Sequence, residues 1–264
     1  MQTMISLANT GYGLHRPHLD LVDHPVFQAL PHNIRSVAQA HSRLIAAPAG
    51  ESLPGKGYLS FVLAGVLGLF PDGERICVAT IVAGSVHGWD HALEPEGDLP
   101  AARALIDTTL CRVPAACVVD GLGRDWLNRL VARQSSRRLS GLAAEAACNA
   151  SHLVQERLAK WLVRLHCGAN GAPLRLTQAD FGAMLGVQRT SVNAAAGRLQ
   201  ALGLVRFGRG KVQILDLARL RAASCGCGDP APASPSSGVV SAPLRRAESP
   251  SWISQDAPRR GNAA

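Results

Sequence analysis

The 264-residue sequence is poor in aromatic residues and in long hydrophobic runs. Aromatic residues make up 4% of the chain and charged residues 17%, whereas hydrophobic residues make up 47%. This balance is typical of a folded globular protein and excludes a fully disordered one. No apolar run reaches the ~20 residues that a membrane-spanning helix needs. We therefore expect a soluble, cytoplasmic protein with no membrane partner.

Cysteines are few and irregularly placed. The seven are Cys77, Cys111, Cys117, Cys148, Cys167, Cys225 and Cys227. An odd number spread over a long chain, with no pattern of a signal peptide, argues against a secreted disulfide framework. The sequence has no C-x-x-C pair, and the one C-x-C, in "SCGCG", supplies too few ligands for a structural zinc site without help from elsewhere. The sequence alone therefore predicts no metal site and no cofactor.

The charge of the chain is unevenly distributed. The formal net charge is +8, yet residues 1–123 hold 7 Lys and Arg against 11 Asp and Glu. Residues 124–221 hold 16 basic against 5 acidic side chains, and residues 222–264 hold 4 against 3. A strongly basic segment beside a mildly acidic one is typical of a nucleic-acid-binding protein. A merely basic surface is the plainer alternative.

Patterning divides the first half of the chain into an N-terminal arm with a short helix (1–41) and a domain of short strands (42–123). The second segment contains apolar runs such as "YLSFVLAGVLGLF" and "RICVATIVAG" at roughly ten-residue spacing, broken by glycine and proline. Pro71-Asp72-Gly73 lies where a hairpin should reverse. These features predict a β-roll sensor domain.

A helical period replaces the strand pattern after Gly123. Apolar residues recur every three or four positions: Trp126, Leu127, Leu130, Val131, Leu139, Leu142 and Ala146. We predict one long dimerisation helix over 124–150, paired with a second copy, with packing against its own β-roll as the alternative. Ser151 should cap a further helix that runs to about Cys167. The segment 228–264 is rich in proline and serine and is expected to be a disordered tail.

The stretch "LTQADFGAMLGVQRTSVNAAAGRLQALG" has the spacing of a helix-turn-helix within a domain over 151–227. Thr177 and Asp180 form a near capping box for a helix over Gln178–Leu185, and Gly186 permits a sharp turn. A second helix begins near Gln188–Arg189. The strand-like "LVRF", a "GRG" turn and "KVQIL" follow and predict a two-stranded wing. The fold class is thus α+β.

The first turns of that second helix would enter the major groove of DNA. Arg189 suits bidentate contact with guanine, Thr190 and Asn193 can reach base edges, and Gln188, Ser191 and Thr177 are better placed for phosphates. Exposed surface roles are the alternative for Gln188 and Ser191. The predicted DNA-binding residues are Thr177, Gln178, Gln188, Arg189, Thr190, Ser191, Asn193, Arg209 and Lys211.

The run "NASHLVQERLAKWLVRLH" and the "LRLTQADFGAMLGVQRTSVNAAAGRLQALGLVRFGRGKVQILD" that follows it resemble the Crp/Fnr superfamily of bacterial transcription regulators. The likeness covers about Ser42–Cys227 and is strong from Cys148 onward. It implies a β-roll resembling a cyclic-nucleotide-binding domain, a long dimerisation helix and a C-terminal winged helix-turn-helix. It also implies a homodimer on a near-palindromic DNA site and contact with RNA polymerase.

The sequence departs from the family's cyclic-nucleotide pattern. Gly88-Trp89 stands where the family has a Gly-Glu that holds a ribose, and Asp98 stands where an arginine holds the cyclic phosphate. An aspartate would repel that phosphate, which argues against cyclic AMP. The first cysteine is Cys77, so the N-terminal iron–sulfur cluster of one branch is not expected. Buried or surface roles are the commoner ones for Cys77, His87 and His91, although a haem site there stays open.

The recognition helix carries Ala194 where the family often has a second polar or basic reader. This leaves the target DNA sequence open. The alternative function is a small-molecule sensor or enzyme whose helical region mediates assembly only. The sequence has no paired carboxylates, nucleophile–histidine pair or glycine-rich phosphate loop, and we therefore predict that the chain is not an enzyme.

Overall fold

The computed structural model describes residues 20–71, 76–93 and 100–227. Residues 1–19 of the predicted N-terminal arm, Asp72 and Gly73 of the predicted turn, Asp98, and the predicted tail over 228–264 therefore lie outside the described residues. The elements in chain order are η1 (Leu21–Asp23), α1 (Pro25–Gln28), α2 (His32–Ala40), β1 (Arg43–Ala47), β2 (Ser52–Leu53), β3 (Tyr58–Ala64), β4 (Val66–Phe70), β5 (Ala79–Val82), β6 (Val86–His87), α3 (Trp89–Leu93), β7 (Ala101–Ala104), β8 (Thr108–Pro114), α4 (Ala116–Val119), α5 (Arg124–Ser151), α6 (Val154–Gly168), α7 (Gln178–Leu185), α8 (Arg189–Ala201), β9 (Val205–Gly208), β10 (Lys211–Ile214) and α9 (Leu217–Ala222).

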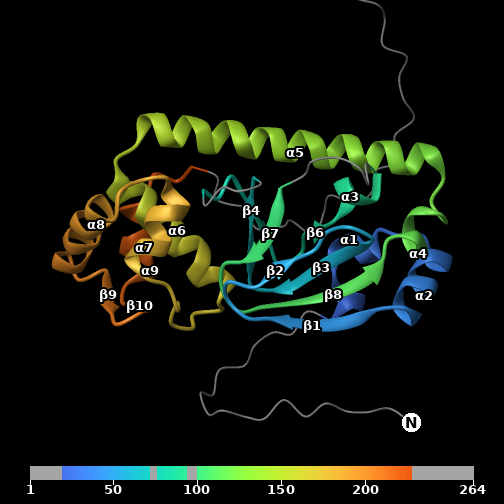
Figure 1. The fold of residues 1–264 in the computed structure, drawn as a ribbon, viewed down its shortest axis with the longest axis horizontal. Helices are drawn as coiled ribbons and strands as arrows, with labels where there is room; N and C mark the ends of the chain where they lie inside the picture. The colour runs from blue at the N-terminus through green and yellow to red at the C-terminus, as the bar shows by residue number, and fades with distance from the viewer. Residues whose placement is uncertain (1–19, 72–75, 94–99, 228–264) are drawn as a thin grey trace, which may run out of the picture. The chain divides into compact units, whose positions relative to one another are not determined.

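Two antiparallel sheets form the strand-rich part of the chain (Figure 1). Their strand orders are β1-β8-β3-β6 and β2-β7-β4-β5. The antiparallel pairing of β4 with β5 agrees with the predicted reversal of the chain between them. Gly65 joins β3 to β4 at φ +95, and a Cβ there would lie 2.4 Å from Thr108 Oγ1, so this tight corner requires glycine. The predicted β-roll is confirmed.

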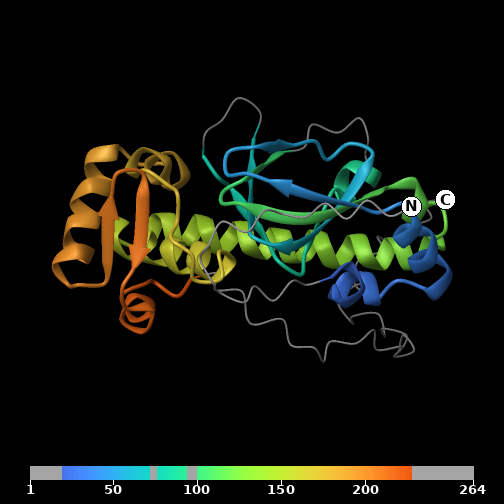
Figure 2. The same cartoon turned by 90° about the horizontal axis from the view of Figure 1, so that it is seen from below.

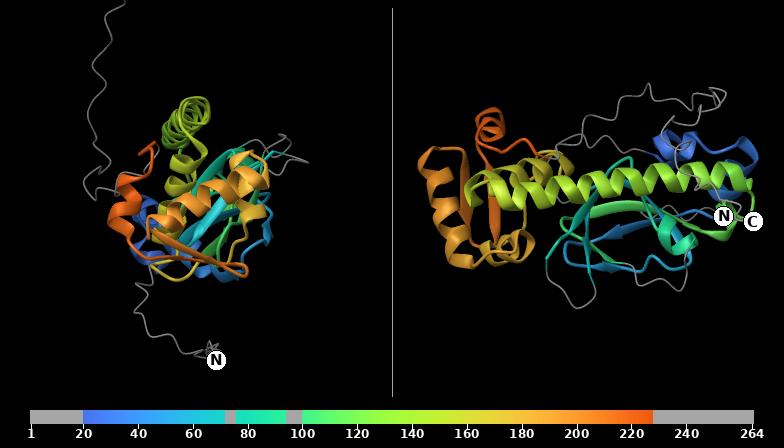
Figure 3. Two further views of the ribbon diagram at one scale, coloured as in Figure 1. Left: turned by 90° about the vertical axis from the view of Figure 1, so that its left-hand side faces the viewer. Right: turned by 90° about the horizontal axis from the view of Figure 1, so that it is seen from above.

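Helix α5 is a single continuous helix (Figure 3) that uses its two halves differently. Near its start, Trp126, Leu127 and Leu130 pack against a core cluster of the β-roll that includes Phe61. The alternative prediction, that this helix packs against its own β-roll, is therefore correct for its first turns. Further along, Leu139 is 69% exposed and nothing in the described chain covers it.

The junction of α5 and α6 corrects one prediction. Ser151 does not cap α6 but is the last residue of α5, and α6 begins at Val154. The cap is instead supplied by Glu156, whose carboxylate accepts the backbone N–H of Leu153 at 3.0 Å. The sequence pattern misplaced the boundary because a serine can be tolerated in a last helical turn as well as at a cap.

A buried ion cluster holds α5 against α6. Glu145 of α5 accepts hydrogen bonds from Lys160 Nζ at 2.6 Å and from Arg164 Nη2 at 3.0 Å, and the two cationic side chains are 2% and 6% exposed. Burial alone would raise the pKa of Glu145, but the hydrogen bonds and positive charges of Lys160 and Arg164 outweigh it and lower that pKa. The carboxylate is therefore charged at neutral pH and is shared by the two buried cations, which leaves a formal charge of +1 on the group.

Two histidines are buried in the β-roll. His24 is fully buried, its Nε2 lies 3.3 Å from the Ser85 carbonyl oxygen, and its ring meets Phe61 edge-on at 5.1 Å. Burial lowers the pKa of His24 to about 4, against the opposing effect of the Ser85 carbonyl. Burial, helped by the charge of His91, also lowers the pKa of His87 to about 4. Both side chains are therefore neutral at neutral pH.

Removing the shared carboxylate of the ion cluster should destabilise the fold. In Glu145→Gln, Lys160 and Arg164 keep their burial but lose their counter-charge, and we expect the free energy of unfolding in urea to fall by roughly 3 kcal/mol. Glu51→Gln, at an exposed position, is the control and should change little. Equal effects of the two substitutions would contradict the assigned role of Glu145.

Acid should weaken the fold through the buried histidines. An unfolded histidine titrates near 6.5, whereas folded His24 titrates at about 4, so the unfolded chain binds more protons between these values. Stability should be full above about pH 6.5 and should fall as the pH drops toward 4, by up to roughly 3 kcal/mol for one such histidine. Urea titrations at several pH values should show a shallower loss in His24→Phe, and an unchanged loss in the exposed control His32→Gln. The same slope in all three proteins would refute the assignment.

Candidate nucleic-acid interface

The first helix of the helix-turn-helix, α7, starts as the sequence predicted. Thr177 is its N-cap: the Asp180 N–H donates to Thr177 Oγ1 at 3.2 Å, and the Thr177 N–H donates to Asp180 Oδ2 at 2.7 Å. The Thr177 hydroxyl also donates to the Asp180 carboxylate at 2.7 Å. This hydroxyl is thus engaged in the cap, and its predicted contact with a DNA phosphate would compete with a bond already made.

The turn between the two helices depends on glycine. Gly186 ends α7 in the left-handed conformation at φ +66, which a residue with a Cβ adopts only under strain. A Cβ at Gly182 would lie 3.1 Å from the Val187 carbonyl oxygen, so the small residue lets the turn pass close to α7. The helix-turn-helix geometry therefore follows from local features of the sequence.

The second helix, α8, has one buried and one exposed face. Its buried residues are Val192, Ala195, Ala196 and Leu199, as their spacing predicted. Arg189, Thr190 and Asn193 are exposed in its first turns, and Gln188 is exposed at its N-cap position. Ser191 is half-buried, which limits what it can reach. The structure thus places the predicted base-reading side chains on the free face of this helix.

The predicted wing is a hairpin of β9 and β10, seen as two orange strands beside α8 in Figure 2. Arg209 and Gly210 form its tip, and Gly210 has φ +67. Cross-strand pairing sets Lys211 opposite Gly208 and Gln213 opposite Arg206. Since side chains alternate between the faces of a strand, Arg206 and Lys211 share the solvent face of the wing.

Arg206 is a candidate phosphate contact that sequence reasoning missed. It is exposed on β9, between Val205, which is buried, and Phe207, which is half-buried. The alternation of valine, arginine and phenylalanine in "LVRF" was the signal that could have found it. Gln200 Oε1 accepts the Phe207 N–H at 2.7 Å and so ties the wing to the end of α8.

Every acidic residue of the helix-turn-helix domain caps one of the domain's own helices. The three carboxylates between residues 154 and 227 belong to Glu156, Asp180 and Asp216. Each accepts a backbone N–H at the start of a helix, at distances of 3.0, 2.7 and 2.9 Å respectively. The negative charges therefore lie at the positive ends of helix dipoles, and the exposed basic side chains are left to attract an external anion.

Gly88 and Trp89 lie in the β-roll, where the resemblance places a ribose contact. Gly88 has φ +104, and Trp89 is buried in the same core cluster as Phe61. A buried indole cannot replace a carboxylate that accepts ribose hydroxyls. Asp98, at the expected phosphate position, lies outside the described residues.

The three residues considered for haem do not form one cluster of ligand atoms in the described part of the chain. His87 and His91 lie together, with ring centroids 5.8 Å apart. Cys77 instead belongs to the core cluster that contains residues of α6, and its thiol donates to the Ala79 carbonyl at 3.1 Å. Burial raises the pKa of Cys77 to about 12, so it is a neutral thiol.

A cleft of about 290 Å³ lies between β5 and α5. Its charged lining residues are Arg138, Glu145 and Arg164. Arg138 forms an ion pair with Asp90, and Glu145 joins Lys160 and Arg164 in the ion cluster. Since each of these side chains already has an ion-pair partner within the protein, a phosphate would have to compete for them, and the cleft offers it a weak site. No helix in the described part of the chain is both long and apolar enough to cross a membrane.

Comparisons with known proteins agree with this geometry. Residues 156–223 match the family of the Crp-like helix-turn-helix domain. No curated protein matches the sequence. Among solved structures, a protein described as a transcriptional regulator of the Crp/Fnr family from Eubacterium rectale ATCC 33656 is similar, with a TM-score of 0.58, 18% identity, and coverage of 75% of this chain and 97% of that chain.

Two further solved structures share the fold. FixK2 from Bradyrhizobium japonicum has a TM-score of 0.52 and 21% identity, covering 70% of this chain and 98% of its own. A transcriptional regulator of the CRP family from Thermus thermophilus has a TM-score of 0.55 and 22% identity, covering 72% and 100%. Together with the winged helix-turn-helix described above, these matches show that the chain carries a Crp-like helix-turn-helix domain at residues 156–223 and shares the fold of these solved structures.

Proposed function

We propose that this chain is a DNA-binding transcriptional regulator that acts as a homodimer on a near-palindromic site. The observation that carries the proposal is α8, whose buried face seats it in the domain and whose exposed first turns present Arg189, Thr190 and Asn193. This is the arrangement by which a recognition helix presents side chains to the major groove. Contact with RNA polymerase is proposed from the family resemblance alone.

Different side chains would read bases and hold the backbone. Arg189 is suited to the O6 and N7 atoms of guanine, with Thr190 and Asn193 beside it. Arg206, Arg209 and Lys211 of the wing would neutralise phosphates and add affinity without sequence preference. Ala194 is exposed one turn into α8 and offers a methyl group in place of a hydrogen-bonding reader.

A stripe along α5 supports the homodimer. Positions separated by four and three residues in alternation are all exposed: Asn128, Ala132, Ser135, Leu139, Leu142, Ala146 and Asn149. This spacing is that of a coiled-coil seam, and its small side chains permit two helices to approach closely. Gly141 lies beside the stripe, and a Cβ there would meet no atom of the described residues within 4 Å.

The β-roll is proposed to be a sensor domain that does not use cyclic AMP. Trp89 is buried where a ribose-binding carboxylate would be needed, and the charges of the cleft beside α5 are paired within the protein. The similarity to regulators supports a protein without catalytic activity. A small-molecule sensor or enzyme with a purely assembling helical region is the competing function, and it would bind no DNA.

Arg189→Ala should reduce the preference for a specific sequence more than it reduces affinity for DNA in general. Loss of a bidentate guanine contact should weaken specific binding by about 5- to 150-fold, while non-specific binding should lose only the share of one charge. Gel-shift titrations at several salt concentrations, on a selected site and on random DNA, measure both. Arg43→Ala, an exposed arginine of β1, is the matched control.

Equal losses on both DNAs would remove Arg189 from base reading. If the full chain binds neither DNA, and thermal-shift screening finds a tight small-molecule ligand, the competing function is favoured. A salt-dependent complex with random DNA alone would leave DNA binding in place but would contradict a sequence-reading role for α8.

Leu139→Arg should dissociate the proposed dimer. A charged side chain in the seam of two helices would have to be buried without a partner, so sedimentation should show a monomer, and affinity for a palindromic site should fall with it. Leu44→Arg is the matched control, because Leu44 is 65% exposed on β1 and Leu139 is 69% exposed. A dimer that persists in Leu139→Arg would move the interface away from this part of α5.

A further inference from the structure

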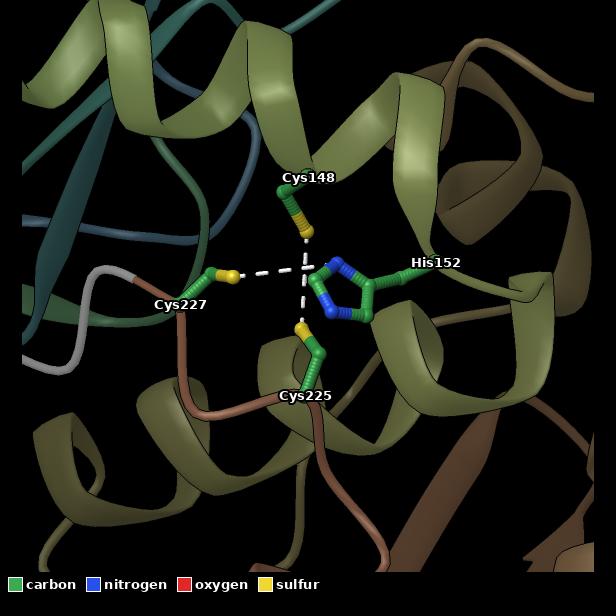
Figure 4. A group of neighbouring side chains, drawn as sticks. All are labelled: Cys148, His152, Cys225 and Cys227. Atoms are coloured by element: carbon green, nitrogen blue, oxygen red, sulfur yellow. Dashed lines mark hydrogen bonds between the residues drawn. The ribbon is translucent and has the colours of Figure 1, made fainter.

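Four metal-ligating side chains converge at the junction of α5 with the DNA-binding domain (Figure 4). They are Cys148, His152, Cys225 and Cys227, and their ligand atoms all lie within 4.8 Å of one another. Neither the DNA contacts nor the dimer seam uses them. Cys148 is buried and the other three are half-buried, so the group is sheltered by the protein on one side and accessible on the other.

The four residues come from two segments that are far apart in the sequence. Cys148 lies in the last turns of α5, and His152 follows one helical turn later, with its N–H donating to the Cys148 carbonyl at 3.1 Å. Cys225 and Cys227 lie just after α9, separated by Gly226 at φ +64. That left-handed residue folds the C-x-C segment so that both thiols face the end of α5 (Figure 4).

The spacing of the ligand atoms fits one tetrahedral ion. Bonds of about 2.3 Å to sulfur and about 2.0 Å to imidazole nitrogen, at tetrahedral angles, place neighbouring ligand atoms roughly 3.5 to 3.8 Å apart. Cys148 Sγ and Cys225 Sγ are 3.4 Å apart, and Cys227 Sγ and His152 Nδ1 are 3.7 Å apart. An iron–sulfur cluster divides its ligands among several irons and would spread them further.

The surrounding charge also suits a cation held by three thiolates. Three thiolates around a divalent ion leave one net negative charge. The Lys160 ammonium, which is 2% exposed, lies 3.2 Å from Cys148 Sγ and would neutralise that charge. Glu145 and Arg164 neutralise each other beside it. With three neutral thiols, the same group would instead carry one excess positive charge in a buried place, which is costly.

We propose that Cys148, His152, Cys225 and Cys227 bind one zinc ion in tetrahedral Cys₃His coordination. Zinc prefers this set of thiolate and imidazole ligands, and a site with four protein ligands is of the structural kind. Binding would release the thiol protons and tie the segment after α9 to the end of α5. The ion would thereby fix both ends of the DNA-binding domain at the joint with the long helix.

Metal uptake by the full-length chain tests the site directly. The protein is purified under reducing conditions, stripped with a chelator, and titrated with Zn²⁺ against a chromophoric competitor. We expect one zinc ion per chain. Co²⁺ in its place should give the intense visible bands of a tetrahedral ion and the near-ultraviolet absorption of thiolate ligation.

Variants identify the ligands. Cys225→Ser and Cys227→Ser should each lower zinc affinity by more than about tenfold, since even partners one shell removed from a metal cost about 10- to 100-fold. Cys167→Ser is the matched control: Cys167 is exposed, its Sγ accepts from Arg221 at 3.3 Å, and it lies outside the group. Circular dichroism of each stripped variant shows whether it is folded, so that a loss of uptake can be assigned to the ligand.

Four results would overturn the zinc site. They are uptake well below one ion per chain, the same affinity in Cys225→Ser as in Cys167→Ser, an octahedral Co²⁺ spectrum, and a coloured iron–sulfur centre formed with iron and sulfide. A Cys148–Cys225 disulfide that survives reduction and blocks uptake would overturn it as well.

The effect on DNA rests on the proposed function and is measured separately. Stripping zinc should weaken DNA binding at least severalfold in the unaltered chain and in Cys167→Ser, and should add nothing to the loss in Cys225→Ser. Equal DNA affinity with and without zinc would overturn the role of the ion at the joint. If no form of the chain binds DNA, the proposed function fails while the stoichiometry of zinc still decides the site.

Discussion

The contact on which the rest of the structure depends is the one that Glu145 makes with Lys160 and Arg164. It joins the long helix α5 to the first helix of the DNA-binding domain by charged hydrogen bonds of 2.6 and 3.0 Å, with both cations almost fully buried. Charges buried in this way hold their partners in one geometry, because a shifted partner leaves a charge without compensation. The end of α5 therefore fixes the position of α6, and α6 in turn fixes the positions of the helices packed on it.

The positions of the acidic side chains also explain why the surface of α8 and the wing is positively charged. Glu156, Asp180 and Asp216 each cap a helix, so the carboxylates of the domain contribute to its folding at positions where helix dipoles favour them. The basic side chains on α8 and the wing do not cap helices and are exposed. They include Arg189, Arg206, Arg209 and Lys211. The positive surface of α8 and the wing thus arises from the positions of the few acidic residues, and not only from the number of basic ones.

The elements of the DNA-binding domain that depend on neighbouring residues could be predicted from the sequence. Contacts between segments that lie far apart in the sequence could not. The capping box at Thr177 and the turn at Gly186 act within a few residues, so α7 was predicted with its observed bounds. Ser151 was wrongly assigned as a cap because two helices meet there. The C-x-C at Cys225 was not predicted to be a metal site, because its further candidate ligands Cys148 and His152 are more than 70 residues away in the sequence and only the fold brings them close. The sequence did not decide whether α5 packs against the β-roll or against a second copy, because the packing of this helix differs along its length.

A zinc ion at the proposed site would link α5 to the DNA-binding domain a second time, through Cys225 and Cys227 after α9. The Glu145 cluster joins α5 to α6 by direct hydrogen bonds and needs no bound ion. The group around Cys148 would be held together by a metal ion that its four ligands share, and Lys160 contacts both groups. A zinc ion with three thiolate ligands would carry one net negative charge and would attract the same lysine that the ion cluster already uses. The strength of the joint would then respond to a bound ion while its geometry stayed the one that Glu145 sets, which separates what positions the DNA-binding domain from what could regulate it.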